Sequence, residues 1–592
     1  MSRSRPRTTR HCLAALGLAV LGAAHPALAA DPPSELGGKI KEKLAAAGIP
    51  VADSDDNTIK IVQTPVLSHW GRSKFDVDPR CKKDSPGCDP TWALKTCNTD
   101  ADCGGPIAPD GTGLSCVALK PAGDKKMCVG HSDELLNELY DQLTIATTAI
   151  DIDSLYPLTG RYMLTLRSAL DYLSTHDREV TVRIQYAGIT GAMFEGMLAD
   201  LMKGVATDTK SKVKVYMGYV WPNTGSWNHA KVVAVDGRVA QVSGNNLVEN
   251  DYLNLQPVHD LALKVAGGAA REAHAFSDIL WGETCRRIGN FSRVRGAAAY
   301  YVWSDGKTSM GARRDCPSKA KLPDKEKGRP AGAYVMSLPR LGSLAYAPAQ
   351  PSDQAILALI NNAKTSIYLS QPRMSMDKML QQIPFLYASG GFASSTIRAI
   401  RDALLRGVDV TAVFGTIKPA VGDKDAGYFG MTPESFIQLV ARTMPSRMKD
   451  ADVATTKRLV NAALCHLRVA NLKFSAADRY PAANHAKFVM GDERVFIVGS
   501  HNLYDANLLE YSYLVDNAKA AADVLENYWG RLWRFSSVGA VRGGSNCDGP
   551  PGAPGALPSY EDDESSLLDD ELLLDDLTPA SADPDVWYFG GI

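Results

Sequence analysis

Helix-like and strand-like patterns of hydrophobic residues alternate along the middle of this chain, and the same succession occurs twice. Between residues 132 and 285, runs with apolar residues at helical spacing, such as SDELLNELYDQLTIAT, alternate with strand-like runs such as VTVRIQYAG and HDLALKVAG. Residues 352–535 repeat this order, from SDQAILALINNAK through VDVTAVFG to AKAAADVLENYWGRLWRF. The pattern predicts an α/β fold with two lobes, each a mixed sheet flanked by helices, related by a pseudo-twofold axis.

Changes in composition divide the chain into five expected parts. The junction between the two lobes is expected within the Lys- and Pro-rich stretch 317–350. After Cys547 the chain becomes rich in Pro and Gly and then acidic, which predicts disorder, with docking on a partner or on the basic body as the alternative. The expected boundaries are a leader at 1–30, an N-terminal segment at 31–130 with a cysteine-rich insert at 81–128, lobes at 131–330 and 331–546, and a tail at 547–592.

The first thirty residues have the pattern of a secretory signal peptide. Four Arg precede a 13-residue apolar run, CLAALGLAVLGAA, which is followed by the small-x-small sequence Ala27-Leu28-Ala29. The alternative is a transmembrane anchor, but 13 residues are too few to cross a bilayer. We therefore expect a secreted or periplasmic protein without a transmembrane anchor.

The chain has eleven cysteines, of which Cys12 lies in the leader, and the remaining even number predicts disulfides in an exported protein. Six crowd between Cys81 and Cys128, in a stretch with few aliphatic residues, which predicts a small disulfide-stapled insert. Zinc binding is the alternative for this cluster, but it has neither a CxxC pair nor a His. For the other four, the pairs Cys285–Cys316 and Cys465–Cys547 are our hypothesis, since spacing alone leaves the connectivity open.

The net charge of −2 argues against a protein that binds nucleic acid mainly through charge. Residues 551–592 hold eleven Asp or Glu and no Lys or Arg, whereas the leader holds four Arg. Without these two parts, residues 31–550 carry a net charge of +5, which suits an anionic interface without requiring one. We expect a monomer without a nucleic-acid partner.

The strongest chemical signal is a motif written twice. The first copy is His229-x-Lys231-x4-Asp236, and the second is His485-x-Lys487-x4-Asp492; an Asn follows each Asp after ten residues, as Asn246 and Asn502. On a strand, residues two apart share a face, so the His and Lys of each copy should point together while the Asp points away. We expect Asp236 and Asp492 to hold neighbouring backbone or side chains, with direct participation in catalysis as the alternative. Two His, two Lys and two Asn in one pocket suit a phosphoryl group and its transfer.

These residues give the chain a resemblance to the phospholipase D superfamily, whose mark is the paired HxKxxxxD motif followed by GSxN. The second copy matches with Gly499-Ser500-His501-Asn502, whereas the first has the small residues exchanged in Ser243-Gly244-Asn245-Asn246. SWNHAKVVAVDG, NDYL, PVHDLALKVAG, LWGETC, GSHNLY and EYSYLV are similar, in the same order, to secreted streptomycete-type bacterial phospholipases D, over most of residues 130–545.

The resemblance implies roles for individual residues. His229 would be the nucleophile, and His485 the general acid and then the base that activates water. A downstream carboxylate would orient each His, and the matching positions are Asp260 and Glu510. The phosphoryl oxygens would be bound by Lys231, Lys487, Asn246 and Asn502, and the further substrate-binding candidates are Ser500, Tyr428 and Trp227. No metal or other cofactor is expected.

Other residues near the motifs have alternative interpretations. Trp221, Trp227 and Tyr252 are expected either as pocket walls or as core packing. His259, beside Asp260, is expected as a surface histidine or as one that supports the site from behind.

The resulting functional expectation is hydrolysis of the distal phosphodiester bond of phosphatidylcholine-like lipids at a membrane or micelle surface. A covalent intermediate would also allow transphosphatidylation to alcohols. The alternative is a secreted phosphodiesterase or nuclease of the same superfamily. A phosphatidyltransferase such as a cardiolipin synthase and a non-enzymatic binding protein are further, weaker alternatives, because membrane segments are absent from the sequence pattern and both motif copies are intact.

Overall fold

The structure is a computed structural model that describes most of residues 33–547. The described ranges are 33–64, 96–103, 115–118, 126–129, 134–176, 178–187, 194–205, 212–222, 226–253, 257–290, 297–304, 306–344, 350–374, 392–415, 430–449, 451–475 and 482–547. The leader, most of the cysteine-rich insert, the tail and Tyr428 lie outside these ranges, so the expectations for them stay predictions. No helix in the described ranges is long and apolar enough to cross a membrane.

The first half of the chain forms a mixed sheet whose strand order, from its outer edge inward, is β12-β11-β7-β6-β5-β8-β9-β10. Strands β5, β6 and β7 are parallel, and their neighbours on both sides run antiparallel to them. The strands are β5 (Ala149–Asp153), β6 (Thr181–Tyr186), β7 (Lys214–Trp221), β8 (Val232–Val235), β9 (Val239–Ser243), β10 (Asp260–Ala266), β11 (Ala297–Ser304) and β12 (Lys307–Met310).

The second half repeats this arrangement in the order β20-β16-β15-β14-β17-β18-β19, again with three parallel strands inside antiparallel neighbours. Its strands are β14 (Ser366–Gln371), β15 (Asp409–Phe414), β16 (Leu467–Asn471), β17 (Phe488–Gly491), β18 (Val495–Gly499), β19 (Leu509–Asp516) and β20 (Val541–Arg542). The mixed α/β architecture expected from the sequence is confirmed, and the repeated strand order agrees with the repeated pattern. The pseudo-twofold axis itself stays a prediction.

Two strands that the hydrophobic pattern did not reveal join the halves into one 17-stranded sheet. Strand β1 (Asp53–Thr64) pairs with β10 and with β13 (Ala333–Leu341), and β13 pairs in turn with β19. Strand β13 lies within the stretch expected to be only a junction between lobes. The sheet is therefore continuous through the junction, and the strands that follow the two motif copies approach each other from either side of β1 and β13.

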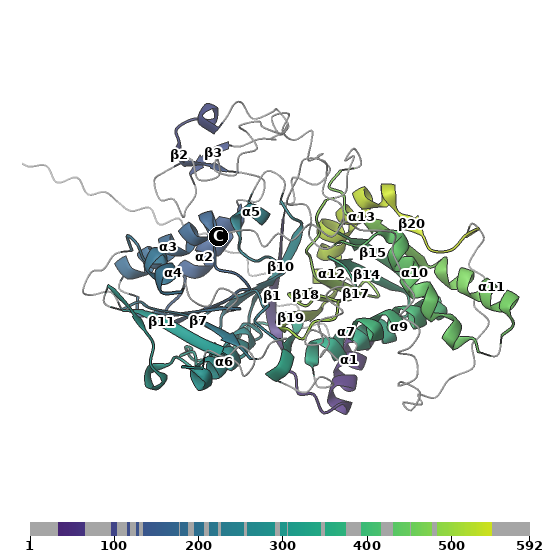
Figure 1. The fold of residues 1–592 in the computed structure, drawn as a ribbon, viewed down its shortest axis with the longest axis horizontal. Helices are drawn as coiled ribbons and strands as arrows, with labels where there is room; N and C mark the ends of the chain where they lie inside the picture. The colour runs from purple at the N-terminus through teal and green to yellow at the C-terminus, as the bar shows by residue number, and fades with distance from the viewer. Residues whose placement is uncertain are drawn as a thin grey trace, which may run out of the picture.

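Helices cover both faces of this sheet (Figure 1). In the figure α2, α3 and α4 lie above the first half and α6 below it, whereas α12 and α13 lie above the second half and α1, α7 and α9 below it. The helices are α1 (Glu35–Ala46), α2 (Glu134–Thr144), α3 (Gly160–Thr175), α4 (Phe194–Leu201), α5 (Glu249–Tyr252), α6 (Ala270–Arg287), α7 (Pro351–Asn362), α9 (Phe392–Leu405), α10 (Pro433–Thr443), α11 (Val453–Leu464), α12 (Ala518–Val524) and α13 (Gly530–Ser536).

Three hydrophobic cores hold the layers together. One packs α2, α3 and α4 against the first half-sheet, and a second packs α1, α7, α9 and α10 against the other. The third core contains residues of both halves, from Phe276 of α6 to Trp529 between α12 and α13. Because burial of apolar side chains is the main stabilising term in folding, this shared core fixes the two halves against each other at the place where the motifs meet.

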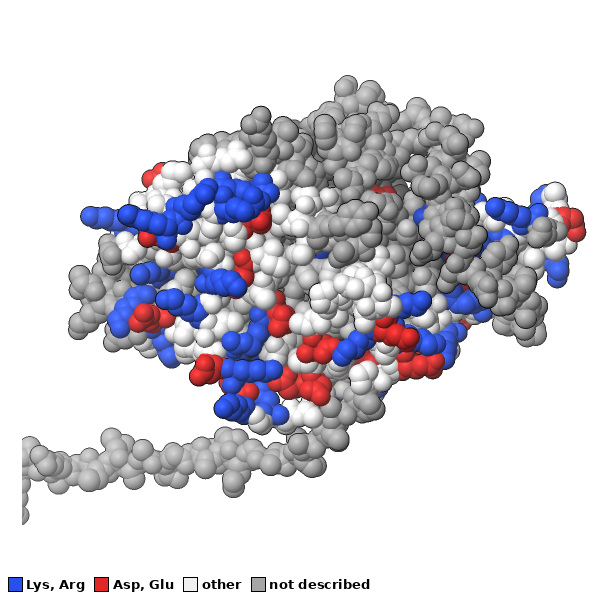
Figure 2. Space-filling view, turned by 90° about the horizontal axis from the view of Figure 1, so that it is seen from below, with Lys and Arg blue, Asp and Glu red and all other residues white. Residues whose placement is uncertain are grey.

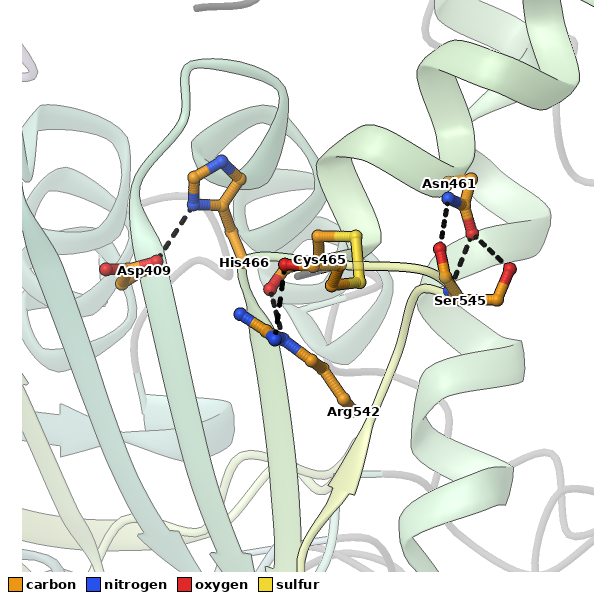
Figure 3. The surroundings of a disulfide bond; sticks show 7 residues. Asp409, Asn461, Cys465, His466, Arg542 and Ser545 are labelled. Atoms are coloured by element: carbon orange, nitrogen blue, oxygen red, sulfur yellow. Dashed lines mark hydrogen bonds and ion pairs between the residues drawn. A yellow bond between two sulfur atoms is a disulfide. The ribbon is translucent and has the colours of Figure 1, made fainter. Parts of the chain in front are cut away.

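Four disulfides occur among the described residues. Cys285–Cys316 and Cys465–Cys547 are paired as hypothesised from the sequence, and the second closes the end of β20 onto the end of α11 (Figure 3). In the insert, Cys97–Cys116 and Cys103–Cys128 link β2 (Thr96–Cys97), a 3-10 turn (Asp100–Cys103), β3 (Ser115–Ala118) and β4 (Lys126–Val129). Among the described residues one group of three metal-type ligands occurs, at Cys97, Cys103 and Cys128, and these sulfurs belong to disulfides.

Charges on the surface are mixed rather than gathered into one stripe. On the face seen in Figure 2, Lys and Arg are spread over the first half and alternate with Asp and Glu toward the middle. Pairs such as Arg238–Glu326 and Arg329–Glu326 neutralise part of the positive charge. This distribution on the described face agrees with the mildly basic body and lacks the continuous basic track that duplex DNA selects.

Candidate active site

The two copies of the motif come together because each forms a short backbone bridge to the opposite half of the chain. The backbone N–H of His229 donates to the carbonyl of Leu509 (2.8 Å), and that of His485 donates to the carbonyl of His259 (2.8 Å). Leu509 begins β19 and His259 directly precedes β10. Each motif is thus anchored beside the strand that follows the other motif.

As a result, each motif histidine contacts the carboxylate that follows the other copy of the motif. Nδ1 of His229 lies 2.8 Å from Oε1 of Glu510, and Nδ1 of His485 lies 3.0 Å from Oδ2 of Asp260. The family resemblance gives each carboxylate as the group downstream of one His, and these positions suggest no exchange between the halves. Each motif His is oriented by the carboxylate of the other half, so neither half alone supplies both a motif His and the carboxylate that orients it.

An asparagine directly before each His holds the motif segments in place. Asn228 donates its side-chain amide to the carbonyl of Gln185 (3.0 Å), and its Oδ1 accepts from the N–H of Ala230 (3.0 Å). Asn484 donates to the carbonyl of Val413 (3.1 Å) and accepts from Ala486 (3.1 Å). Both motif segments are therefore hydrogen-bonded to the ends of parallel strands, β6 and β15. The sequence signal for this role is the Asn that precedes the His in both copies of Asn-His-Ala-Lys.

Both lysines are buried next to the histidines. Lys231 is 2% exposed and Lys487 is 3% exposed, and each Nζ donates to the backbone carbonyl of the His two residues earlier. Burial, and then the charge of Lys487, lower the pKa of Lys231 well below its usual value. Burial also lowers the pKa of Lys487 to about 7, against the attraction of Asp260 and Glu510. An anion bound between the lysines would favour their charged forms, so the site is suited to an anionic group.

The surroundings of both motif histidines favour the neutral imidazole. Burial lowers the pKa of His229 to about 3, and the charges of Lys231 and Lys487 add to this shift. Burial, Lys487 and Lys231 likewise lower the pKa of His485 well below its usual value. When the Nδ1 proton is donated to a carboxylate, Nε2 of the neutral ring carries the free lone pair. His229 is therefore held in the tautomer that can attack an electrophile through Nε2.

The two asparagines after the motifs have buried amide groups with unused hydrogen-bonding capacity. Asn246 and Asn502 are each 2% exposed, and their Oδ1 atoms have no hydrogen-bond partner within the described ranges. Nδ2 of Asn502 donates to the hydroxyl of Tyr504 (2.8 Å). Buried polar atoms are normally satisfied, so the matched unpaired Oδ1 atoms would accept from a donor on a ligand, whereas an anionic oxygen would be bound by the Nδ2 groups.

The motif aspartates point away from the histidines and hold backbone instead. Asp236 accepts hydrogen bonds from the backbone N–H groups of Thr147, Thr148 and Ala149, at 2.7–2.9 Å. Asp492 accepts from Lys364, Thr365 and Ser366 in the matching place, at 2.7–3.2 Å. Each aspartate therefore caps the start of the first parallel strand, β5 or β14. This geometry favours the structural role over direct participation in chemistry.

The order Ser243-Gly244 in the first copy, the reverse of Gly499-Ser500 in the second, has a steric reason. A Cβ at Gly244 would lie 2.2 Å from Oδ1 of Asp260 and 2.7 Å from the carbonyl of His485, so a side chain cannot fit there. Ser500 occupies the matching position in the second copy, and its hydroxyl accepts from the backbone N–H of Tyr511 (3.0 Å). Ser500 was expected among the substrate-binding residues, but its buried hydroxyl is engaged with β19.

The remaining candidates fall into different places. Trp227 is partly exposed and its ring lies 5.5 Å from that of Trp221, beside the motif. Tyr252 is fully buried, and its hydroxyl donates to Oδ2 of Asp260 (3.1 Å) and lies 3.1 Å from Nδ1 of His485. His259 is not at the surface, since it is fully buried and its Nδ1 lies 2.8 Å from the carbonyl of Thr64.

Comparisons with known proteins agree with the geometry of the site. The family model described as "Cardiolipin synthase, PLD-like domain" matches residues 356–533, which include the second motif copy. A phospholipase D from Streptomyces antibioticus is 25% identical over 349 residues, which cover 53% of this chain and 60% of that protein. The match thus spans less than two thirds of the length of this relative.

Solved structures that match this chain include a phosphatidylserine synthase from Haemophilus influenzae Rd KW20 (TM-score 0.42, 15% identity, 68% of this chain and 84% of that chain). They also include Nuc from Salmonella typhimurium, described as a phospholipase D family member (TM-score 0.19, 16% identity, 34% of this chain and 94% of that chain). Together, the paired motifs, the family model and the Streptomyces relative show that the chain belongs to the phospholipase D superfamily.

Proposed function

We propose that this enzyme is a secreted phospholipase D that cleaves the distal phosphodiester bond of glycerophospholipids such as phosphatidylcholine. The observation that carries the proposal is the pair of crossed His–carboxylate contacts, His229–Glu510 and His485–Asp260, beside two buried lysines. One imidazole can act as a nucleophile, while the other donates a proton to the leaving oxygen and later removes one from the attacking oxygen.

The chemistry follows from these positions. Lys231, Lys487 and the amides of Asn246 and Asn502 would bind the non-bridging oxygens of the phosphodiester. The bound anion raises the proton affinity of the buried bases around it, which allows His485 to hold a proton next to Asp260. Nε2 of His229 attacks phosphorus, the bond from phosphorus to the head-group oxygen breaks, and His485 protonates that oxygen. A phosphohistidine with the phosphatidyl group on His229 results.

The second step reverses these roles. Water enters, His485 removes its proton, and the water oxygen attacks phosphorus. The bond from phosphorus to Nε2 of His229 breaks, which releases phosphatidate and restores the neutral imidazole. A primary alcohol can replace water as the acceptor and then receives the phosphatidyl group. His485 ends protonated in either case and is ready for the next leaving group.

The substrate class is supported by similarity and by charge. The 25% identical relative carries the name phospholipase D, and the mixed charges on the face seen in Figure 2 do not favour a polyanionic nucleic acid over a lipid head group. Export is proposed from the leader pattern, and the four disulfides fit an oxidising compartment. The five-part division of the chain, the monomeric state and the acceptor-side role of Tyr428 remain part of this proposal.

The test uses purified protein, phosphatidylcholine vesicles, ethanol and excess EDTA. We expect choline release together with phosphatidylethanol, and loss of both in His229→Ala and His485→Ala. The matched control is His466→Ala, because His466 also pairs with a carboxylate, the exposed Asp409 at 2.8 Å, near the Cys465 disulfide (Figure 3). Cleavage of DNA without any lipid product would move the substrate to nucleic acid and refute the phospholipase assignment. Hydrolysis without phosphatidylethanol would contradict the covalent route.

A further inference from the structure

We propose that Arg340, Asp353 and His501 position His229 through Glu510, whereas Tyr252 positions His485 through Asp260, so that the two chemical steps have separate and unequal support. The inference rests on the proposed function, because it divides that reaction between two sets of residues. It assigns roles to side chains that neither motif contains, except for His501 inside the second GSxN sequence.

Arg340 lies directly across from Glu510 where β13 pairs with β19. Its Nη1 donates to Oε2 of Glu510 (3.2 Å), the carboxylate oxygen that His229 does not use. Its Nε donates to Oδ1 of Asp353 (2.8 Å) in the first turn of α7, and the side chain is almost fully buried. The planar guanidinium group of Arg340 thus donates to two carboxylates at fixed angles, an arrangement that the single ammonium group of lysine cannot reproduce.

His501 closes the network from the loop after β18. Its Nε2 lies 3.2 Å from Oδ1 of Asp353 and 3.9 Å from Oε2 of Glu510, and its Nδ1 lies 2.7 Å from the hydroxyl of Ser352. Phe392 of α9 stacks on the imidazole with ring centroids 4.9 Å apart. Glu510 therefore has His229 on Oε1 and Arg340 and His501 on Oε2, and these contacts on both oxygens hold it toward His229.

The other carboxylate lies in a different environment. Thr64 of β1, not an arginine, lies directly across from Asp260 in β10. The hydroxyl of Tyr252 donates to Oδ2 of Asp260, the same oxygen that lies near His485, and among the described residues no arginine forms an ion pair with Asp260. A neutral phenol therefore holds this pair where a charged guanidinium holds the other.

The charges that face each carboxylate lead to opposite protonation tendencies. Burial would raise the pKa of Glu510, but the hydrogen bond of His229 and the charges of His501, His229 and Arg340 outweigh it and lower the pKa to about 2. Burial raises the pKa of Asp260 to about 6, although Lys487, the N–H of Leu261, His259 and Tyr252 oppose the shift.

These surroundings separate the functions of the two pairs. Glu510 stays ionised and keeps the proton of His229 on Nδ1, so that Nε2 remains available for attack. Asp260 changes protonation close to neutral pH, within hydrogen-bond distance of His485 and Tyr252. It is therefore suited to a pair that must accept and release a proton during every turnover.

The experiment compares two lipids with the same acyl chains, phosphatidylcholine and phosphatidyl-p-nitrophenol, in single-turnover reactions. Nitrophenolate departs without a proton, whereas choline needs one from the general acid. Arg340→Lys should slow both substrates by about 10- to 100-fold, the expected loss for one hydrogen bond between charged groups. Tyr252→Phe should slow phosphatidylcholine by about tenfold and leave phosphatidyl-p-nitrophenol nearly unchanged.

The pH profile gives a readout that a merely structural role would not move. Arg340 holds the pKa of Glu510 low, so Arg340→Lys should raise that pKa and move the acidic limb of the phosphatidyl-p-nitrophenol reaction toward neutral pH. Arg340→Met combined with Asp353→Asn removes one charge of each sign and should show the same shift if Arg340→Lys does not fold. Arg183→Lys is the matched control, because Arg183 is an equally buried arginine paired with Asp151, on the face of the sheet covered by α6.

The inference is overturned if Arg340→Lys slows only phosphatidylcholine, if its pH profile matches that of wild type, or if Arg183→Lys produces the same pattern. It is also overturned if Tyr252→Phe slows both lipids equally. If wild type cleaves neither lipid, the proposed substrate fails. The positioning roles are then decided by the same variants on bis(p-nitrophenyl) phosphate, in rate and in pH profile.

Discussion

The two halves of the molecule have the same strand order and the same motif, yet different residues surround the carboxylate that each half supplies to the site. Across from Glu510 the sheet places the charged Arg340, and across from Asp260 it places the neutral Thr64. Behind the first parallel strand, α6 covers a polar cluster in which Arg183 pairs with Asp151 and Asp278. The duplicated architecture thus supplies equivalent backbone positions in the two halves. The different side chains at these positions give the two histidines different electrostatic surroundings.

The same contrast appears at the equivalent place in the second half. There Tyr368 stacks on Trp529 with ring centroids 4.8 Å apart, where Asp151 and Arg183 form an ion pair in the first half. Burying an ion pair is costly unless its geometry is good, whereas an aromatic pair adds to apolar burial. The halves therefore differ in their buried polar groups.

The largest expected effect separates the histidines themselves. His229→Ala and His485→Ala should each lower phosphatidylcholine turnover by about 10⁴-fold, since each removes one chemical role. With phosphatidyl-p-nitrophenol, His485→Ala should still release one equivalent of nitrophenolate per enzyme, whereas His229→Ala should release none. Stopped-flow absorbance measures the burst. A burst from His229→Ala alone would invert the assignment of nucleophile and acid.

The two orienting carboxylates should differ by leaving group. Glu510→Gln should slow both lipids by about 10²- to 10⁴-fold, because it weakens the nucleophile. Asp260→Asn should act mainly on phosphatidylcholine. Because the pKa of Asp260 is raised to about 6, wild-type turnover of phosphatidylcholine should lose activity as pH falls through about 6. That limb should be absent in Asp260→Asn. Equal effects of both substitutions on both lipids would remove the distinction between the pairs.

The motif aspartates should affect stability and not chemistry, the buried one more strongly. Asp236→Asn should lower the free energy of unfolding by about 1–3 kcal/mol, because it leaves backbone donors at the start of β5 poorly satisfied. Asp492→Asn should cost less, since Asp492 is partly exposed. Urea unfolding measures both, with single-turnover rates as the comparison. A large loss of rate in a variant of unchanged stability would assign these aspartates to the chemistry.

The contribution of Asp236 should also depend on pH. Burial would raise the pKa of Asp236, but hydrogen bonds from Thr147, Ala149 and Thr148 outweigh it and lower the pKa. A carboxylate with a lowered pKa stabilises the fold above its unfolded value of about 3.9, and this stabilisation is lost as pH falls through the lowered folded value. Wild type should therefore lose its advantage over Asp236→Asn below about pH 4.

The smallest expected difference lies between the disulfides of the two halves. Cys465–Cys547 closes a sequence separation of 82 residues and Cys285–Cys316 one of 31. If constraint of the unfolded chain dominates, replacing the first pair by Ser should cost about 1 kcal/mol more than replacing the second. Thermal and urea unfolding of the two double variants measure this difference. The opposite order would show that native-state packing around Cys285–Cys316 outweighs the loop term.

The sequence predicts what repeats in it, and it predicts little of what crosses between the copies. The pattern locates the parallel strands because β6 (TVRIQY) and β15 (DVTAVF) are short, mostly buried runs rich in β-branched and aromatic residues. The repeated motif locates the histidines and lysines, and strand alternation places Asp236 and Asp492 on the far side. Resemblance to the family supplies Asp260 and Glu510, but not the exchange that pairs each with the other half.

What the sequence missed depends on long-range pairing. Strand β1 has a half-exposed, alternating pattern rich in Asp, and β13 lies in a stretch that looks like a linker, so neither stands out locally. Arg340 gains its partners only because β13 pairs with β19 in one register. Tyr252 resembled pocket wall or core until its hydroxyl was placed between Asp260 and His485. A single sequence contains no signal for contacts of this kind.

The most direct test of the account is to map the covalent intermediate. Enzyme quenched within a single turnover of phosphatidyl-p-nitrophenol would be digested at alkaline pH, where phosphohistidine survives, and analysed by mass spectrometry. We predict a phosphatidyl group on His229 in wild type, more of it in His485→Ala, and none in His229→Ala. Finding the adduct on His485, or finding turnover without any adduct, would contradict the proposed division of work between the two halves.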